Sequence, residues 1–152
     1  MMGDPSPASR KVLHVTWQRL VDNTGLTCSR CHETETCLDE AMGAMRPLLS
    51  GQGIEIILQK KRILPLAFKQ DPLASNIIFI EGKPLENWLQ TETSRSPCCD
   101  VCGDNECRTL SFKGKTYEAV PVELIIRGLL RAVETVFGIK LERLPEDVKA
   151  AR

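Results

Sequence analysis

The N-terminal half of the chain shows two strand patterns separated by a helical one. Apolar and polar residues alternate over Val12–Val21 and again over Ile54–Arg62, and this alternation predicts two strands. Between them, apolar residues recur at helical spacing from Leu38 to Leu49. Because a strand, a helix and a strand joined by short connections form a right-handed crossover, we expect the two strands to be parallel.

The helix between these strands is expected to begin beside a pair of cysteines. The loop Asp22–Gly25 is followed by Cys28-Ser-Arg-Cys31, and the helix is expected to start at or just after this pair. Pro47 is expected to kink or end the helix, and the Gly51–Gly53 segment closes it. The cysteine pair therefore belongs to the N-terminal end of the helix.

The middle of the chain predicts a connection followed by a hairpin. Ile63–Ala74 contains two prolines and is expected to be a connection. Asn76–Ile80 is a compact apolar strand pattern that ends at Glu81-Gly82, a two-residue turn into Lys83-Pro84-Leu85. These residues predict an antiparallel pair of strands.

The C-terminal part contains a cysteine-rich insertion over residues 91–108, followed by a second hairpin. Thr109–Phe112 and Lys115–Val120 are the strand patterns of this hairpin, and Lys113-Gly114 is its turn. We expect the insertion itself to be a polar loop.

The last helix has the clearest pattern. Its apolar residues form one stripe from Val122 to Phe137, Pro121 suits its first turn, and Gly138 supplies the stop. The predicted fold class is α/β, with a central mixed sheet of about four strands flanked by helices. The cysteine-rich insertion and the extra hairpin precede the last helix.

Length and composition fit one ordinary globular domain. The chain has 152 residues, of which 42% are hydrophobic and 26% charged, and this balance excludes disorder of the whole chain. We expect residues 1–10 to be disordered, residues 11–144 to form the domain, and residues 145–152 to form a flexible tail.

Charge and hydropathy exclude two classes of partner. The 20 basic and 20 acidic residues give a net charge of zero, so no excess positive field attracts a nucleic-acid backbone or an anionic membrane. The start of the chain lacks the apolar core of a secretory signal, and no apolar run approaches the roughly 18 residues of a membrane helix. We therefore expect a cytoplasmic protein that binds neither nucleic acid nor membranes.

Cysteine is the residue type out of proportion, and Cys28 and Cys31 are the predicted catalytic pair. In a reducing compartment, the 7 cysteines favour metal binding or redox chemistry over a permanent disulfide framework. At a helix N-terminus, unpaired N–H groups and the helix dipole lower the pKa of the Cys28 thiol, which makes Cys28 the attacking thiol. Cys31, one turn further, can resolve a mixed disulfide by attacking the Cys28 sulfur. The alternatives are a pair of inert thiols or half of a structural metal site.

Two nearby residues, His32 and Cys37, are weaker candidates for a functional role. His32 completes a string that matches c-type haem attachment, but that attachment follows export and the chain shows no export signal. His32 is instead expected to be exposed in the first turn of the helix. Cys37, nine residues after Cys28, falls on the opposite side of the helix and is expected to be a half-buried structural thiol.

A second group of cysteines lies in the insertion, at Cys98, Cys99, Cys102 and Cys107. Four sulfurs within ten residues can surround one Zn²⁺ or ligate an iron–sulfur cluster. Adjacent Cys98 and Cys99 do not easily point at one ion, so three of the four are possible ligands, with a fourth from the Cys28/Cys31 pair. Two alternatives remain open: a second redox pair, Cys99 and Cys102, that exchanges with the first, or an incidental cysteine-rich loop.

The order of elements resembles the thioredoxin fold: a strand, a Cys-x-x-Cys at the start of a helix, a parallel strand, a β-hairpin and a terminal helix. Asn76–Lys83 is similar to the hairpin of glutaredoxin-type members. The resemblance covers Val12–Leu89 and the last helix. More closely, the chain is similar to an uncharacterised prokaryotic family of thioredoxin-like proteins. The segments that carry this similarity are Trp17–Val21, the Cys28/Cys31 pair, Asp71–Asn76 and Pro97–Gly103.

One position departs from the thioredoxin pattern. The resemblance implies a cis-proline before the hairpin strand, opposite the cysteine pair, and helping to keep metals off it. Asn76 stands at the corresponding position here. This difference weakens the redox interpretation and strengthens the metal-binding one.

Two hypotheses of different classes follow. In the first, the protein is a cytoplasmic thiol–disulfide oxidoreductase that acts on protein thiols or disulfides, with Cys28 as nucleophile, Cys31 as resolving thiol and the second cluster as a relay. In the second, the cysteine thiolates bind zinc, an iron–sulfur cluster or a soft metal or metalloid ion without redox turnover.

Overall fold

The structure is a computed structural model that describes residues 11–21, 29–97 and 106–141. Two sheets and four α-helices make up this part of the chain. The expectations for residues 1–10 and for the C-terminal tail lie outside the described residues, as do Cys28, Cys98, Cys99 and Cys102.

The first sheet has four strands in the order β2-β1-β3-β4. The strands are β1 (Lys11–Leu20), β2 (Ile54–Ile63), β3 (Ile77–Ile80) and β4 (Lys83–Pro84). β1 pairs in parallel with β2 and antiparallel with β3, and β3 pairs antiparallel with β4. The mixed four-stranded sheet, the parallel first pair and the hairpin are confirmed.

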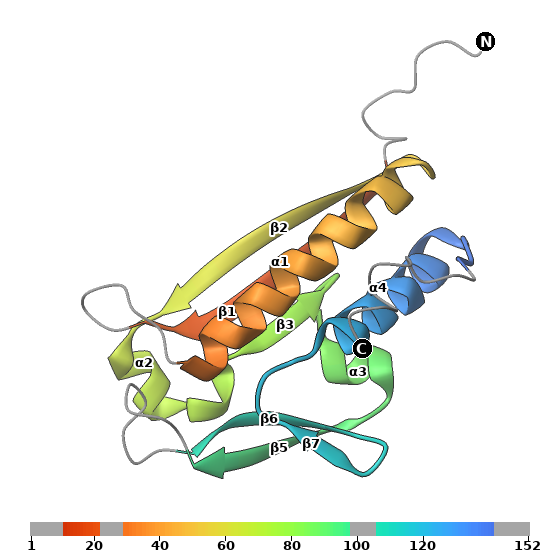
Figure 1. Cartoon of the computed structure of the whole chain (residues 1–152). Helices are drawn as coiled ribbons and strands as arrows, with labels where there is room; N and C mark the ends of the chain where they lie inside the picture. Colours follow the sequence, from red (N-terminus) through yellow and green to blue (C-terminus); the bar gives the residue numbers. More distant parts are fainter. Residues whose placement is uncertain (1–10, 22–28, 98–105, 142–152) are drawn as a thin grey trace, which may run out of the picture.

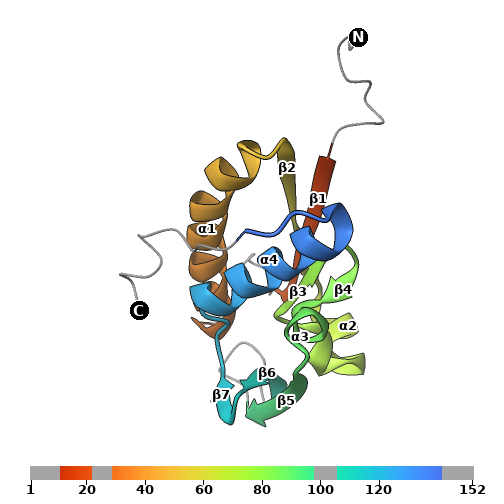
Figure 2. The same cartoon turned by 90° about the vertical axis from the view of Figure 1, so that its right-hand side faces the viewer.

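Two long helices cover one face of this sheet (Figures 1 and 2). They are α1 (Ser29–Ser50) and α4 (Val122–Phe137). Alternate residues of β1 enter the core beneath them, with Leu13, Val15 and Trp17 at most 1% exposed. The apolar stripe of α4 meets the same core, which includes Ile125, Ile126, Leu129 and Val133. The burial pattern therefore follows the predicted periods of strand and helix.

Proline and glycine residues near the ends of α1 and α4 were expected to set where these helices begin and end. α4 is preceded by Pro121 and ends at Gly138, which adopts a left-handed backbone conformation with φ of 70°, as predicted. α1 does not end at Pro47 but continues through it to Ser50. Pro47 lies in the last turn, so its missing N–H removes one hydrogen bond near the end of the helix rather than in its middle, and the backbone carbonyl that its ring crowds is that of Gly43.

The expectation of a plain connection between β2 and β3 was wrong. This segment contains the short helix α2 (Pro65–Gln70) and the 3-10 turn η2 (Pro72–Ala74). Pro65 suits the first position of α2 because a proline needs no backbone partner there. A further short helix, α3 (Leu85–Leu89), follows β4 and packs against α4.

A second, antiparallel sheet has the order β5-β6-β7 and lies near the N-terminal ends of α1 and α4 (Figure 1). Its strands are β5 (Glu92–Pro97), β6 (Glu106–Phe112) and β7 (Lys115–Tyr117). The predicted hairpin with its Lys113-Gly114 turn is confirmed, and both turn residues have positive φ. The first half of the insertion is a strand rather than a polar loop. β5 lacks an apolar alternation, and its pairing with β6 produces the strand.

No helix in the described part of the chain is long and apolar enough to cross a membrane.

Candidate functional site: the Cys31 end of the first sheet

Cys31 lies in the first turn of α1, at the end of the sheet where β1 and β2 finish. It is the third residue of the helix, and it is 2% exposed within the hydrophobic core cluster. α1 begins between the two predicted catalytic residues, at Ser29, as the sequence indicated. Cys28 itself lies outside the described residues.

Ser75 is a polar neighbour of the Cys31 thiol. Its Oγ lies 3.7 Å from the Cys31 Sγ, within hydrogen-bonding distance for sulfur. The same oxygen accepts a hydrogen bond of 2.9 Å from the backbone N–H of Leu20, at the end of β1. Ser75 is 1% exposed. Because a hydroxyl has one donor and two acceptor positions, Ser75 can accept from Leu20 and still donate its proton to a thiolate at Cys31.

Asn76 follows Ser75 and has a left-handed backbone conformation, with φ of 64°. Asparagine tolerates this conformation better than most residues. Its side-chain Oδ1 accepts a hydrogen bond of 3.1 Å from the indole Nε1 of buried Trp17. No peptide bond in the described segments is cis. The residue that the sequence resemblance led us to compare with a cis-proline is thus a left-handed asparagine hydrogen-bonded to a tryptophan.

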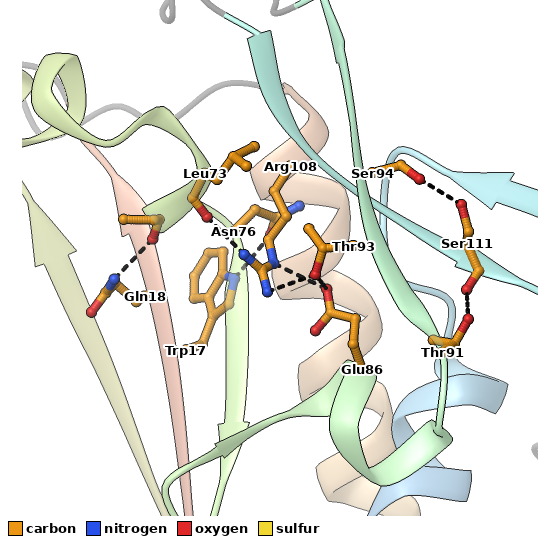
Figure 3. A network of polar contacts seen from close by, with 11 residues as sticks. Trp17, Gln18, Leu73, Asn76, Glu86, Thr91, Thr93, Ser94, Arg108 and Ser111 are labelled. Carbon is orange, nitrogen blue, oxygen red and sulfur yellow. Dashed lines mark hydrogen bonds and ion pairs between the residues drawn. The ribbon is translucent and has the colours of Figure 1, made fainter.

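A group of polar contacts connects this end of the first sheet to the second sheet (Figure 3). Arg108 of β6 donates hydrogen bonds to the carbonyl of Leu73 in η2 and to the carboxylate of Glu86 in α3. Glu86 is 5% exposed although it is charged, so its pairing with Arg108 offsets the cost of burial. The segment that presents Ser75 is therefore held from both sheets.

His32 and Cys37 occupy the positions that the helical pattern indicated. The His32 side chain is 72% exposed, with its Nδ1 3.9 Å from a Glu35 carboxylate oxygen. Cys37 is half-buried against the core. Burial, with the carboxylate of Glu40, raises the pKa of the Cys37 thiol, although a hydrogen bond with the Val122 backbone acts in the opposite direction. A raised pKa keeps Cys37 protonated and a poor nucleophile at neutral pH.

The second cysteine group falls largely outside the described residues. Cys107 is in β6, in register with Ser96 of β5, and Cys98, Cys99 and Cys102 lie outside the described residues. Among the described side chains, no group of three or more His, Cys, Asp or Glu residues is arranged to hold a metal ion. The zinc and iron–sulfur hypotheses for the second group therefore remain predictions.

Sequence reasoning missed three residues of this region: Ser75, Glu86 and Arg108. Ser75 contacts a residue 44 positions away, and Arg108 contacts Leu73 across 35 positions. A short sequence window contains no signal for such pairs. The one local sign was the polar pair Ser75-Asn76 before β3, because a buried strand pattern preceded by serine and asparagine requires partners for both side chains.

A groove of about 900 Å³ between α3 and α4 is separate from the Cys31 thiol. Its lining is mostly polar or charged and includes Lys83, Trp88, Arg131 and Glu134. Among the residues that the structure describes, only Glu86 belongs both to this lining and to the hydrogen-bond partners of Arg108.

The chain matches a family described as a domain of unknown function (DUF2703) over residues 13–128. It is also 39% identical over 114 residues to an uncharacterized protein of the archaeon Archaeoglobus fulgidus, which covers 74% of this chain and 82% of that protein. No solved structure matches the chain.

Proposed function

We propose that this chain, which belongs to the DUF2703 family, is a thiol–disulfide oxidoreductase of thioredoxin-like architecture. The observation that carries the proposal is the buried Cys31 thiol in the first turn of α1, with the Ser75 hydroxyl 3.7 Å away. A hydroxyl that donates to a thiolate stabilises the charged form, which is the reactive form in disulfide exchange. A cysteine that only fills the core needs no such neighbour.

The order of elements supports the thioredoxin-like part of the proposal. A strand, a helix and a parallel strand are followed by a hairpin and a terminal helix, and the two long helices share one face of the sheet. The cysteine pair follows the first strand of this series. The DUF2703 match spans these elements from β1 into α4.

The proposed reaction has two exchange steps. The Cys28 thiolate attacks one sulfur of a substrate disulfide, forms a mixed disulfide and expels the other sulfur as a thiolate, which takes up a proton. The Cys31 thiolate then attacks the Cys28 sulfur, releases the second substrate thiol and leaves a Cys28–Cys31 disulfide. The substrate gains two electrons, and an external dithiol returns two electrons to the pair. In the relay hypothesis, the second cysteine group, which contains Cys98, Cys99, Cys102 and Cys107, passes electrons between the external dithiol and the Cys28/Cys31 pair.

Reduction of an aromatic disulfide by the full-length, pre-reduced protein tests the proposal. Cys28→Ser is expected to abolish turnover, and Cys31→Ser is expected to stop after one exchange, with a trapped mixed disulfide. Cys37→Ser is the matched control and should retain the wild-type rate. An undiminished rate in the Cys28→Ser protein would overturn the proposal.

The metal content of anaerobically purified, untagged protein decides between this function and thiolate metal binding. About one zinc ion or one iron–sulfur cluster per chain, together with absent disulfide turnover, would favour metal binding. Metal-free protein with a reducible cysteine pair would favour the oxidoreductase. Absence of tight Zn²⁺ binding by the reduced protein in an anaerobic titration would exclude the structural-zinc hypothesis.

A further inference from the structure

We infer that Arg108 is a positioning residue for the Cys31 thiol, and that it acts through the 73–76 segment and the Ser75 hydroxyl. The inference rests on the proposed function only in giving Cys31 a chemical role. It assigns a task to the second sheet: β6 supplies the side chain that fixes the segment facing Cys31.

Arg108 uses its whole guanidinium group to join three elements. Its Nη1 donates to the Leu73 carbonyl at 2.9 Å, its Nε to Glu86 Oε2 at 3.0 Å, and its Nη2 to Thr93 Oγ1 at 3.1 Å (Figure 3). The Arg108 side chain is 12% exposed and that of Glu86 6%. A planar group with fixed donor directions can satisfy three acceptors at once, whereas a lysine ammonium on a flexible stem cannot reproduce this geometry.

Glu86 provides the fixed end of this arrangement. It belongs to α3, which packs on α4, and its backbone carbonyl accepts a hydrogen bond of 2.9 Å from Thr91. Its carboxylate also lies 3.3 Å from the Thr93 hydroxyl. The carboxylate belongs to α3, which packs on the main core. Arg108 bonds both to this carboxylate and to Leu73, so it fixes the position of η2 relative to that core.

Residues 74–76 follow Leu73, the residue that Arg108 contacts, and they are held by β1. Gln18 Nε2 donates to the Ala74 carbonyl at 2.8 Å, and Leu20 N–H donates to Ser75 Oγ. Trp17 donates to Asn76. Thus each residue from 73 to 76 makes one of these contacts, and the first comes from the second sheet while the other three come from β1.

The distance between Ser75 and Cys31 makes the hydrogen bond between them sensitive to the position of Ser75. At 3.7 Å between Oγ and Sγ, the contact is near the limit for a hydrogen bond to sulfur. A small outward movement of Leu73 would carry Ser75 with it and weaken donation to a Cys31 thiolate. Loss of the Arg108 contact is therefore expected to shift the reactivity of Cys31 without removing any group that touches it.

The test measures the pH dependence of Cys31 alkylation, with the modified residue located by peptide mass spectrometry. The reduced, full-length Cys28→Ser protein is compared with the same protein carrying Ser75→Ala, Arg108→Lys or both. Ser75→Ala is expected to move the profile about one pH unit upward, which corresponds to one charge-assisted hydrogen bond. Arg108→Lys is expected to move it in the same direction by a smaller amount. Arg131→Lys, an exposed arginine of α4, is the control and should leave it unchanged.

The double variant separates positioning from a general structural role. If Arg108 acts through Ser75, Arg108→Lys adds no further shift in the Ser75→Ala protein. An additive shift would overturn the route through Ser75. A profile unchanged by Arg108→Lys, with a lower melting temperature, would assign the arginine to stability alone. If Arg108→Lys does not fold, Glu86→Gln replaces it, since it weakens the same anchor without leaving a buried carboxylate unpaired.

The two proposals fail separately. If the wild-type protein shows no disulfide turnover, the oxidoreductase proposal is overturned. The alkylation profiles would still test the effect of Arg108 and Ser75 on Cys31. Normal turnover, with profiles that do not respond to Arg108→Lys, would overturn the positioning role and leave the function standing.

Discussion

The two sheets of this protein are held in place by different interactions. Buried apolar side chains from β1, β2 and β3 join the first sheet to α1 and α4, and Trp17, Ile78 and Ile80 are at most 2% exposed. In the described part of β5–β7, only Thr109 and Leu110 are buried, and Phe112 and Tyr117 are partly buried against the core that Leu110 joins. Side-chain hydrogen bonds from Arg108 to η2 and α3 add to this smaller apolar contact.

This difference affects how each sheet tolerates change. Apolar burial is non-directional, so the first sheet depends on volume and area, and it persists when individual polar contacts are lost. Directional hydrogen bonds depend on one geometry, so the second sheet, with less apolar burial, depends more strongly on a few hydrogen-bonding atoms. The segment beside Cys31 lies where the two kinds of interaction meet.

The largest expected effect comes from the core of the first sheet. Leu129→Ala in α4 should lower the free energy of unfolding by about 2–5 kcal/mol, because it removes a fully buried side chain and leaves a cavity. Urea denaturation followed by circular dichroism measures this change. Leu66→Ala, at a side chain that is 72% exposed, is the control and should change stability little. Equal losses in both variants would contradict the assignment of the core.

The next effect should be confined to the second sheet. Arg108→Ala is expected to cost about 2–3 kcal/mol, because it leaves the buried Glu86 carboxylate without its charged partner. Hydrogen exchange should accelerate in β5–β7 more than in β1 and α1. The control, Arg131→Ala, removes an exposed arginine and should leave exchange unchanged. Uniform acceleration over both sheets would show that they unfold as one unit.

A smaller loss should follow from the contact between α1 and the segment before α4. Thr34 is fully buried, and its Oγ1 accepts a hydrogen bond of 3.1 Å from the backbone N–H of Val120. Thr34→Val keeps the shape but leaves that N–H unsatisfied, so stability should fall by about 1–2 kcal/mol. Thr36→Val, on the exposed face of α1, serves as the control in the same denaturation experiment. Equal stability of the two variants would show that the Val120 N–H finds another partner.

The smallest effect belongs to the surface. Lys60 lies 2.9 Å from Glu35 and 3.2 Å from Asp39, and Lys60→Met should cost less than about 1 kcal/mol because such exposed pairs are weak. Partial burial works against the charge, but hydrogen bonds with both carboxylates raise the pKa of Lys60 above its ordinary value of 10.5.

The raised pKa fixes the sign of the pH dependence. The stabilisation by Lys60 is fully present below pH 10.5 and is lost as the pH rises through the higher pKa of the folded protein. The difference in urea midpoint between wild type and Lys60→Met should therefore shrink in strongly alkaline buffer. A difference that grows there would contradict the assigned ion pairs.

Much of the first sheet and part of the site were accessible from the sequence. Alternation and helical spacing predicted β1, α1, β2, both hairpins and α4, because each pattern lies within one segment and reflects burial on one face. The same reasoning placed Cys31 at the start of a helix. It missed β5, which has no alternation of apolar and polar side chains and whose strand conformation depends on its pairing with β6.

The elements with a local driving force follow from the amino-acid pattern alone: periodic burial, a proline before α4 and a glycine after it. Which polar groups contact Cys31 depends instead on how distant segments pack together. Ser75 reaches it because β1 holds the 73–76 segment, and Arg108 reaches that segment because β6 packs against η2. These contacts join residues that are distant in the chain, and a hydrogen bond depends on tenths of an ångström, which periodicity does not encode.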